Sequence, residues 1–95
     1  MQNIMAQAKK IQGEIERITK EIESTEYEFK NDSIHVVATG NNKIKKIVIL
    51  KNEIIEDQEL MEDIICVGVN DVLGQIKKDK DEKLGKYTGG LGGIL

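Results

Sequence analysis

The chain opens with an apolar stripe whose members are separated alternately by three and four residues. This spacing places the stripe on one face of an α-helix. Its members are Met1, Ile4, Ala8, Ile11, Ile15, Ile18 and Ile22. Because the stripe covers only about three heptads, a coiled coil and packing against another helix of the same fold both fit it. We predict a helix over residues 1–22, weakened at Gly13 by about 1 kcal/mol relative to alanine.

From residue 25 the apolar period changes to two, which is typical of a half-buried strand. Tyr27 and Phe29 alternate with charged residues, and Asn31-Asp32-Ser33 supplies turn-forming side chains. A β-branched run over residues 34–39 leads into Gly40-Asn41-Asn42, whose residues tolerate positive φ. A further apolar run follows over residues 43–50. We predict a three-stranded antiparallel meander.

The last predicted strand is apolar on both faces toward its end. Strict alternation puts Ile44, Lys46, Val48 and Leu50 on one face, and Lys45, Ile47 and Ile49 on the other. Both faces should therefore be covered, by helices and by a second subunit, or the strand should pair across a dimer as a sheet edge. The residues assigned to a dimer interface are Ile44, Ile47, Val48, Ile49 and Leu50.

A second long helix is predicted to follow a short connector. Asp57 is a candidate N-cap, and carboxylates follow it in the first turns, near the positive end of the helix dipole. The first half of the helix has a broad apolar surface, whereas residues 75–86 are almost wholly polar. Gly68 and Gly74 should act as weak points of a plain helix, a bend or a close helix approach being the alternative. The predicted fold is α+β in the order α-β-β-β-α, with two long projecting helices.

The size and composition of the chain indicate one small domain. Its 95 residues can bury only a modest core, which must be mainly aliphatic because there is no tryptophan and only one phenylalanine. The longest apolar run, residues 64–69, is far shorter than the roughly 20 residues of a membrane span, and the N-terminus does not resemble a signal peptide. We expect a cytoplasmic protein with a domain over residues 1–88 and a flexible, glycine-rich tail over residues 89–95, the glycines ending the last helix.

The sequence offers little for catalysis or metal binding. His35 is the only histidine and Cys66 the only cysteine, one on a predicted strand and one in a predicted helix. We expect Cys66 to be a buried free thiol that acts as a small hydrophobic residue. One histidine and one cysteine fall short of the ligand set of zinc, and no nucleophile–base pair is evident. The sequence predicts no enzyme activity, no metal and no cofactor.

Charge is segregated along the chain, although the net charge is only −3. Acidic residues concentrate in residues 21–32 and 53–63, which should lie near the sheet, whereas basic residues concentrate at the projecting ends of the two helices. The candidate DNA-binding residues are Lys9, Lys10, Arg17, Lys20, Lys77, Lys78, Lys80, Lys83 and Lys86. The shortage of aromatic residues disfavours a protein that stacks unpaired bases, so duplex phosphates are the better target.

Three segments, in this order, make the chain resemble the YbaB/EbfC family of bacterial nucleoid-associated proteins. They are the opening Asn3-Ile4-Met5-Ala6-Gln7-Ala8-Lys9-Lys10-Ile11-Gln12, the helix core Glu62-Asp63-Ile64-Ile65-Cys66-Val67-Gly68-Val69-Asn70-Asp71, and the ending Gly85-Lys86-Tyr87-Thr88-Gly89-Gly90-Leu91. The resemblance implies a homodimer with tweezer-like helical arms that bind duplex DNA in the nucleoid. The chain departs from the family at Lys30-Asn31-Asp32-Ser33, where members commonly have a glycine-rich turn.

Two functions therefore compete at this stage. The leading hypothesis is a DNA-binding homodimer whose four arms present the basic residues to phosphates. The alternative is an assembly module without direct DNA binding, which recruits a partner such as a DNA-repair protein through the first apolar stripe and the tail. The acidic net charge favours this alternative, and nothing in the sequence indicates binding to a membrane.

Overall fold

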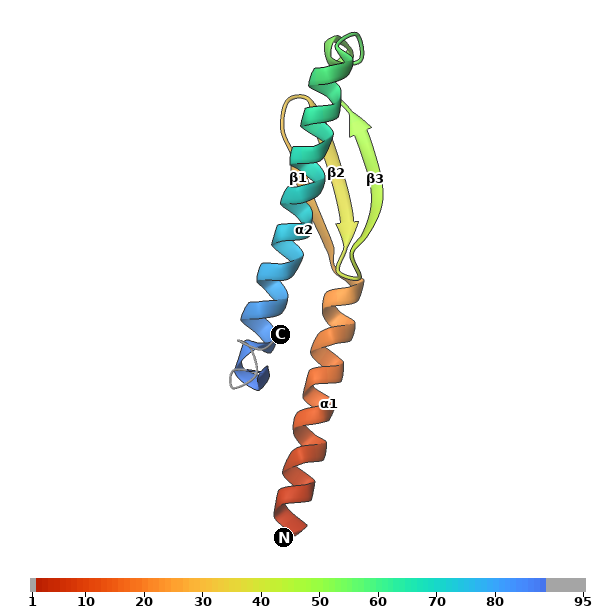
Figure 1. Cartoon of the computed structure of the whole chain (residues 1–95). Helices are drawn as coiled ribbons and strands as arrows, with labels where there is room; N and C mark the ends of the chain where they lie inside the picture. The colour runs from red at the N-terminus through yellow and green to blue at the C-terminus, as the bar shows by residue number, and fades with distance from the viewer. Residues whose placement is uncertain (1, 89–95) are drawn as a thin grey trace.

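The computed structural model describes residues 2–88 as an elongated molecule of 67 × 25 × 15 Å. Helix α1 (Gln2–Ser24) leads into strands β1 (Glu26–Lys30), β2 (Ile34–Thr39) and β3 (Lys43–Ile49). A 3-10 turn, η1 (Asn52–Ile54), then connects to the long helix α2 (Gln58–Thr88). This order confirms the predicted α-β-β-β-α arrangement (Figure 1).

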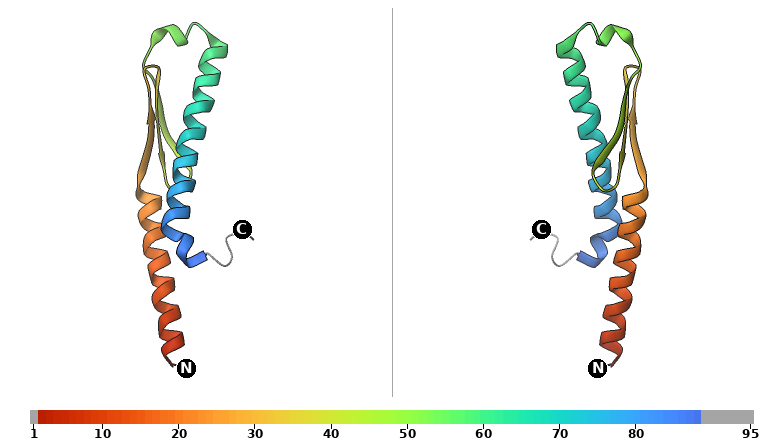
Figure 2. Two further views of the ribbon diagram at one scale, coloured as in Figure 1. Left: turned by 90° about the vertical axis from the view of Figure 1, so that its left-hand side faces the viewer. Right: turned by 90° about the vertical axis from the view of Figure 1, so that its right-hand side faces the viewer.

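The three strands form one antiparallel sheet in the order β1-β2-β3, and α2 lies along one face of it (Figure 2). The core lies between β1, β2 and α2. It is formed by Tyr27, Ile34, Val36, Ala38, Val72 and Ile76. Helix α2 covers β1 and β2 but has few contacts with β3, whose side chains are exposed except for the half-buried Ile49. The sheet is therefore covered on one face and only in part.

A β-bulge corrects the predicted division of β3 into two faces. The register shifts between Val37 and Ala38, so that Lys45 is the extra residue on β3. Ile44 is paired with Ala38, while Ile47 and Ile49 are paired with Val36 and Ile34. Strict alternation put Ile44 on the opposite face from Ile47 and Ile49, and this was wrong. The bulge gathers these isoleucines on the side that faces α2.

The turns are formed by asparagine side chains and by one close backbone approach. Asn31 Oδ1 accepts hydrogen bonds from the backbone N–H groups of Ser33 and Ile34, each at 2.9 Å, so this turn forms without glycine. Asn42 has a φ of 63°, as its place in the second turn predicts. Gly40 lies against the end of α1, where a Cβ atom would be only 1.8 Å from the Ile22 carbonyl oxygen.

Helix α2 begins as predicted, but two details of it differ from expectation. Asp57 caps it, because its Oδ1 accepts from the Leu60 N–H at 3.1 Å. Gly68 is a close approach and not merely a weak point, since a Cβ there would be 2.8 Å from Val36 Cγ2. Cys66 is exposed, which corrects the expected burial, because the broad apolar surface of α2 is wider than the strip that touches the sheet. The helix also continues through Gly85 to Thr88.

The predicted tail over residues 89–95 lies outside the described residues. Neither of the two described long helices combines the length and the apolarity that a membrane span requires.

Candidate nucleic-acid interface

The two helices meet below the sheet and form one arm. The last turns of α2 pack beside the second half of α1, and the Tyr87 hydroxyl donates a 2.7 Å hydrogen bond to Glu14 Oε2 (Figure 1). Helix α1 continues alone beyond this point to its N-terminus. The sequence predicted two projecting helices with neighbouring basic ends. In the structure the two helices lie side by side, and α1 reaches further than α2.

The basic residues of α1 share its outer face. Helical spacing puts Lys9, Lys10, Arg17 and Lys20 opposite the apolar stripe, and all of them are exposed. Arg17 forms a 2.9 Å ion pair with Glu21, one turn further along. Among residues 2–88, Lys9, Lys10 and Lys20 have no ion pair of this kind. These three lysines can therefore neutralise a phosphate without first breaking an ion pair.

The basic residues of α2 are divided among different surroundings. Lys77 and Lys78 are exposed, whereas Lys80 is half-buried. Lys83 forms an ion pair with Asp79 at 3.1 Å, and the ammonium of Lys86 lies 4.9 Å from the centre of the Tyr87 ring. The candidate residues of α2 therefore differ in exposure and in interaction partners.

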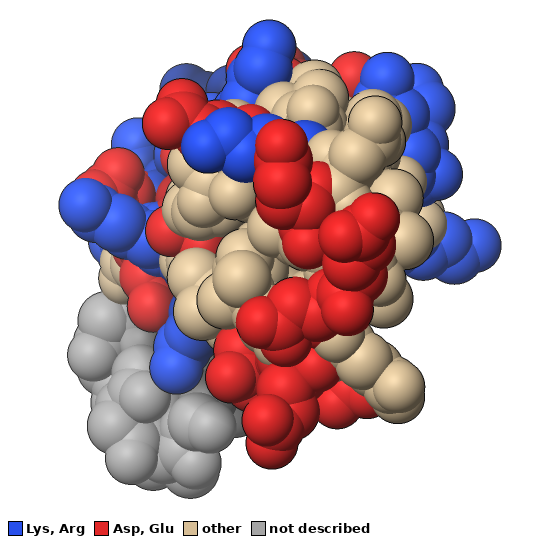
Figure 3. Space-filling view, turned by 90° about the horizontal axis from the view of Figure 1, so that it is seen from above, with Lys and Arg blue, Asp and Glu red and all other residues tan. Residues whose placement is uncertain are grey.

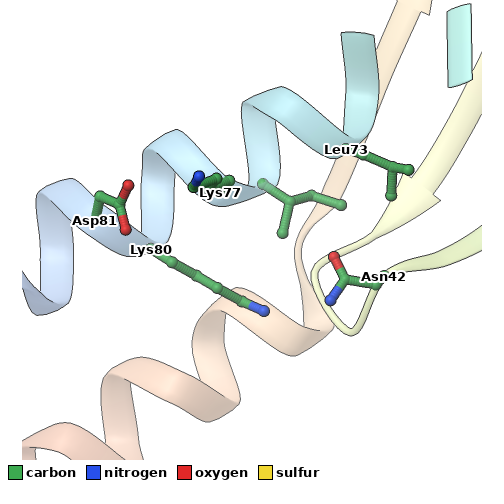
Figure 4. Close-up of a pocket in the computed structure, with 6 residues that line it drawn as sticks. Asn42, Leu73, Lys77, Lys80 and Asp81 are labelled. Atoms are coloured by element: carbon green, nitrogen blue, oxygen red, sulfur yellow. The ribbon is translucent and has the colours of Figure 1, made fainter. Parts of the chain in front are cut away.

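A pocket of about 480 Å³ lies where α2 passes the turn between β2 and β3. It is lined by Asn42, Leu73, Ile76, Lys77, Lys80 and Asp81. Lys80 extends across the pocket toward the side chain of Asn42, whereas Lys77 is directed away from that turn (Figure 4). An ammonium and an amide over an apolar floor can hold an anionic group, and Asp81 at the rim offsets part of this positive charge.

The opposite end of the molecule is strongly acidic. Residues 53–63 contain six carboxylates and no basic residue. This end is viewed directly in Figure 3, where acidic side chains cover much of the surface. On the outer face of the sheet, Glu26 is paired with Lys45, and His35 Nε2 lies 2.8 Å from Glu28. The chain therefore has an acidic end, and the basic residues of α1 gather on its outer face, which also carries Glu16.

Two hydrogen bonds that position the arm were not predicted from the sequence. One is the Tyr87–Glu14 bond, and the other joins β1 to α2, where the Tyr27 hydroxyl donates to Asp79 Oδ2 at 2.5 Å. Burial and the neighbouring Asp79 raise the pKa of Tyr27 to about 12. The bond from Tyr27, with help from Lys83, lowers the pKa of Asp79. These pairs are separated by 73 and 52 residues, so no local spacing could have revealed them.

The described residues contain no group of three or more histidine, cysteine or acidic side chains arranged to hold a metal ion. His35 is on the outer face of the sheet and Cys66 is on exposed α2 surface, so the structure does not bring them together.

Comparison with known proteins gives consistent results. The model of the YbaB/EbfC DNA-binding family matches residues 1–91. A nucleoid-associated protein of Ruminiclostridium cellulolyticum is 36% identical over 98 residues, covering 99% of this chain and 84% of the relative. A nucleoid-associated protein of Lactococcus lactis subsp. lactis is 38% identical over 95 residues, covering 96% of this chain and 95% of the relative. A third, from Enterococcus faecalis, is 32% identical, with 99% and 93% covered.

Proposed function

The chain belongs to the YbaB/EbfC DNA-binding family, and from this premise we propose that it is a nucleoid-associated protein that binds duplex DNA as a homodimer. Binding occurs mainly through phosphate contacts from the arm. The observation that carries this proposal is the outer face of α1, where exposed lysines without carboxylate partners line a projecting helix. Lysine contacts of this kind supply most of the affinity of a protein that binds DNA without reading its sequence.

The charge distribution makes binding compatible with the net charge of −3. The acidic end, residues 53–63, is at the far end of the molecule from the tip of α1. DNA is therefore repelled from one end and attracted to the other, which orients the chain arm-first during encounter. The aromatic side chains support a duplex target: Tyr27 is buried, Phe29 packs against the core, and Tyr87 is bonded to Glu14, so none of them forms an exposed stacking platform.

The candidate basic residues differ in the contribution expected from each. Arg17 and Lys83 already have carboxylate partners, and a phosphate must compete with Glu21 and Asp79 for them. The strongest contributions should come from Lys9, Lys10, Lys20, Lys77 and Lys78. Lys80 is half-buried and can hold one phosphate at the pocket beside Asn42. Lys86 is held near the Tyr87 ring, so its contribution to DNA binding should be smaller than that of the exposed lysines named above.

Dimerisation is proposed through β3. This strand is a sheet edge, and its isoleucines on the α2 side remain open, with Ile44 37% and Ile47 40% exposed. Half-buried Ile49 lies on the same side. Val48, paired with His35, is on the outer face, and exposed Leu50 follows the strand, so the proposed interface includes both faces of β3 toward its end. A second subunit that covers β3 would remove apolar area from water and satisfy the unpaired edge of the sheet.

The direct test of DNA binding is fluorescence anisotropy of a labelled mixed-sequence duplex, titrated at several salt concentrations. Affinity should fall log-linearly with salt, and Lys9→Glu with Lys10→Glu, on the outer face of α1, should remove most of it. The matched control is Lys30→Glu with Lys51→Glu, which makes the same charge change outside both the arm and β3 and should retain most of the affinity. If the wild-type chain does not bind even at low salt, recruitment of a protein partner becomes the better explanation.

The dimer is tested separately by light scattering at micromolar concentration. Ile44→Asp with Ile47→Asp should yield the mass of one chain, because two carboxylates cannot be buried without partners. Val67→Asp, at an exposed apolar position on α2, should keep the mass of two chains. A wild-type chain with the mass of one would contradict the dimer without deciding whether DNA binds.

A further inference from the structure

The tip of the arm carries an apolar stripe that nothing in the described chain covers. Helix α2 reaches α1 only as far as the Tyr87–Glu14 hydrogen bond. On the N-terminal side of this point the stripe continues through Ile4, Ala8 and Ile11, and Ile4 is 70% exposed. Met5 borders the stripe and is 67% exposed. Ile4 and Met5 are the most exposed large hydrophobic side chains among the described residues.

The covered and uncovered parts of the stripe are continuous. Ile15 and Ile18 are half-buried beside α2, and Ile22 is fully buried, at the same helical spacing as Ile4, Ala8 and Ile11. A stripe with alternating spacings of three and four is the pattern that packs against another helix. The covered half shows that this stripe does pack in that way. The uncovered half has the same chemistry and lacks only the second helix.

The charges around the uncovered stripe suit an identical helix. Gln7 and Gln12 flank it, and no carboxylate occurs before Glu14. Lys9 and Lys10 lie on the opposite face of the helix. Two copies of this segment can therefore approach through their stripes without bringing like charges together, which is the usual obstacle to pairing of identical helices.

We propose that residues 4–11 of α1 pack against the same segment of a second copy of the chain. The contact covers the stripe formed by Ile4, Ala8 and Ile11 and leaves Lys9 and Lys10 on the outside of the helix pair. Two arms joined in this way present basic faces in opposite directions, and each face can hold a different duplex. The contact itself is between proteins, so its existence does not depend on DNA binding.

Cysteine cross-linking tests this contact even if it is weak. In a Cys66→Ser background, which removes the exposed native thiol, Ala8→Cys places a thiol at the centre of the stripe. Ala6→Cys is the matched control, because it lies within the same turns but on the opposite face. A disulfide requires Cα atoms within about 7 Å. Under mild oxidation without DNA, Ala8→Cys should give roughly tenfold more covalent dimer than Ala6→Cys. Equal yields would overturn the proposal.

Sedimentation equilibrium supplies a second measurement without cysteine. Ile4→Ser with Ile11→Ser should abolish concentration-dependent association beyond the dimer proposed through β3. Serine and isoleucine have similar helix propensities, so the helix should persist, which circular dichroism can verify. The control, Ala6→Ser with Gly13→Ser, adds the same hydroxyls to the other face, where a Cβ at Gly13 meets no atom within 4 Å. It should associate like the wild type.

Other occupants of the stripe give different results. If residues 89–95 of the same chain cover it, the wild type will not associate further and Ala8→Cys will not cross-link between chains. If the stripe contacts DNA, Ile4→Ser with Ile11→Ser will weaken duplex binding in dilute protein while the cross-linking yields remain equal. Either result overturns the pairing of two arms.

Discussion

Strands β2 and β3 are neighbours in one sheet and are both rich in isoleucine and valine, yet their surroundings are opposite. In β2, Ile34, Val36 and Ala38 are completely buried. In β3, Ile44 and Ile47 remain more than a third exposed. The difference arises because α2 lies over β1 and β2 and has few contacts with β3. The apolar pattern of a strand therefore shows which face favours burial, but not whether another part of the same chain buries it.

The same contrast occurs within α1. Ile22 is 1% exposed and Ile4 is 70% exposed, although both belong to one stripe with regular spacing. The boundary is set by the place where α2 ends beside Glu14. Substitutions in covered regions should change the free energy of unfolding. Substitutions in uncovered regions should change the association between chains.

Gly40→Ala should cause the largest loss of stability. A Cβ would lie 1.8 Å from the Ile22 carbonyl oxygen and 2.4 Å from the Ile22 carbonyl carbon, so the backbone of α1 or of the β2–β3 turn must move. We expect the free energy of unfolding to fall by about 3 kcal/mol, measured by urea denaturation. Gly74→Ala is the control: no atom lies within 4 Å, and the helix should gain up to about 1 kcal/mol. Equal stabilities for the two variants would contradict the close approach.

Gly68→Ala should have a smaller effect, because its new Cβ meets side chains and not backbone. The distances would be 2.8 Å to Val36 Cγ2 and 3.3 Å to Phe29 Cδ2. Overpacking of about 2 kcal/mol is partly offset by a helix-propensity gain of about 1 kcal/mol, so the net loss should be about 1 kcal/mol. In a double-mutant cycle with Val36→Ala, which removes Cγ2, the two losses should be less than additive. Strict additivity would show that the helix does not rest on Val36.

Tyr27→Phe should cost about 1.5 kcal/mol at neutral pH, because it removes a hydrogen bond to a charged carboxylate at the edge of the core. The pH dependence of this cost follows from two shifted groups. Tyr27 has its pKa raised from 10.0 to about 12, so its stabilisation is complete below pH 10 and is lost as the pH rises from about 10 toward about 12. Asp79 has a lowered pKa, so its stabilisation is present above the ordinary value of 3.8 and is lost as the pH falls through the folded-state pKa.

The measurement is the difference in unfolding free energy between wild type and Tyr27→Phe across the pH range. Taking the difference cancels the titration of lysines that both proteins share. The difference should be largest between about pH 5 and pH 9 and should shrink on both sides. A difference that stays constant above pH 10 would show that the phenol does not titrate with a raised pKa in the folded chain.

The sequence predicted those parts of the fold that depend on local pattern. The first helix, the three strands, the turn at Asn42 and the cap at Asp57 all follow from periodicity and turn chemistry, and the structure confirms them, with the helix over Gln2–Ser24. The bulge at Lys45 could not be predicted in this way, because it depends on how β3 pairs with β2 and not on β3 alone. The exposure of Cys66 was missed for a related reason: an apolar run shows hydrophobicity, but not how much of a helix touches the sheet.

For the candidate interface, the sequence identified the basic residues but not their surroundings. The ion pairs of Arg17 and Lys83 join residues four apart on a helix and could have been foreseen from spacing. The half-burial of Lys80 beside the β2–β3 turn and the contact between Tyr87 and Glu14 depend on how α2 packs against the rest of the chain, which sequence spacing does not determine.

Tyr87→Phe tests the boundary between covered and uncovered regions, and its effect on global stability should be the smallest. The hydroxyl forms one hydrogen bond, to Glu14, at the end of α2, where a helix frays most easily. Its loss should cost about 0.5 kcal/mol in global unfolding, yet amide hydrogen exchange should become several-fold faster in the last turn of α2 and around Glu14. Glu14→Gln keeps an acceptor oxygen and should have a weaker effect than Tyr87→Phe. If neither variant changes local exchange, the apolar contact between the two helices sets the boundary between the covered and uncovered parts of α1. The Tyr87 hydroxyl then does not determine that boundary.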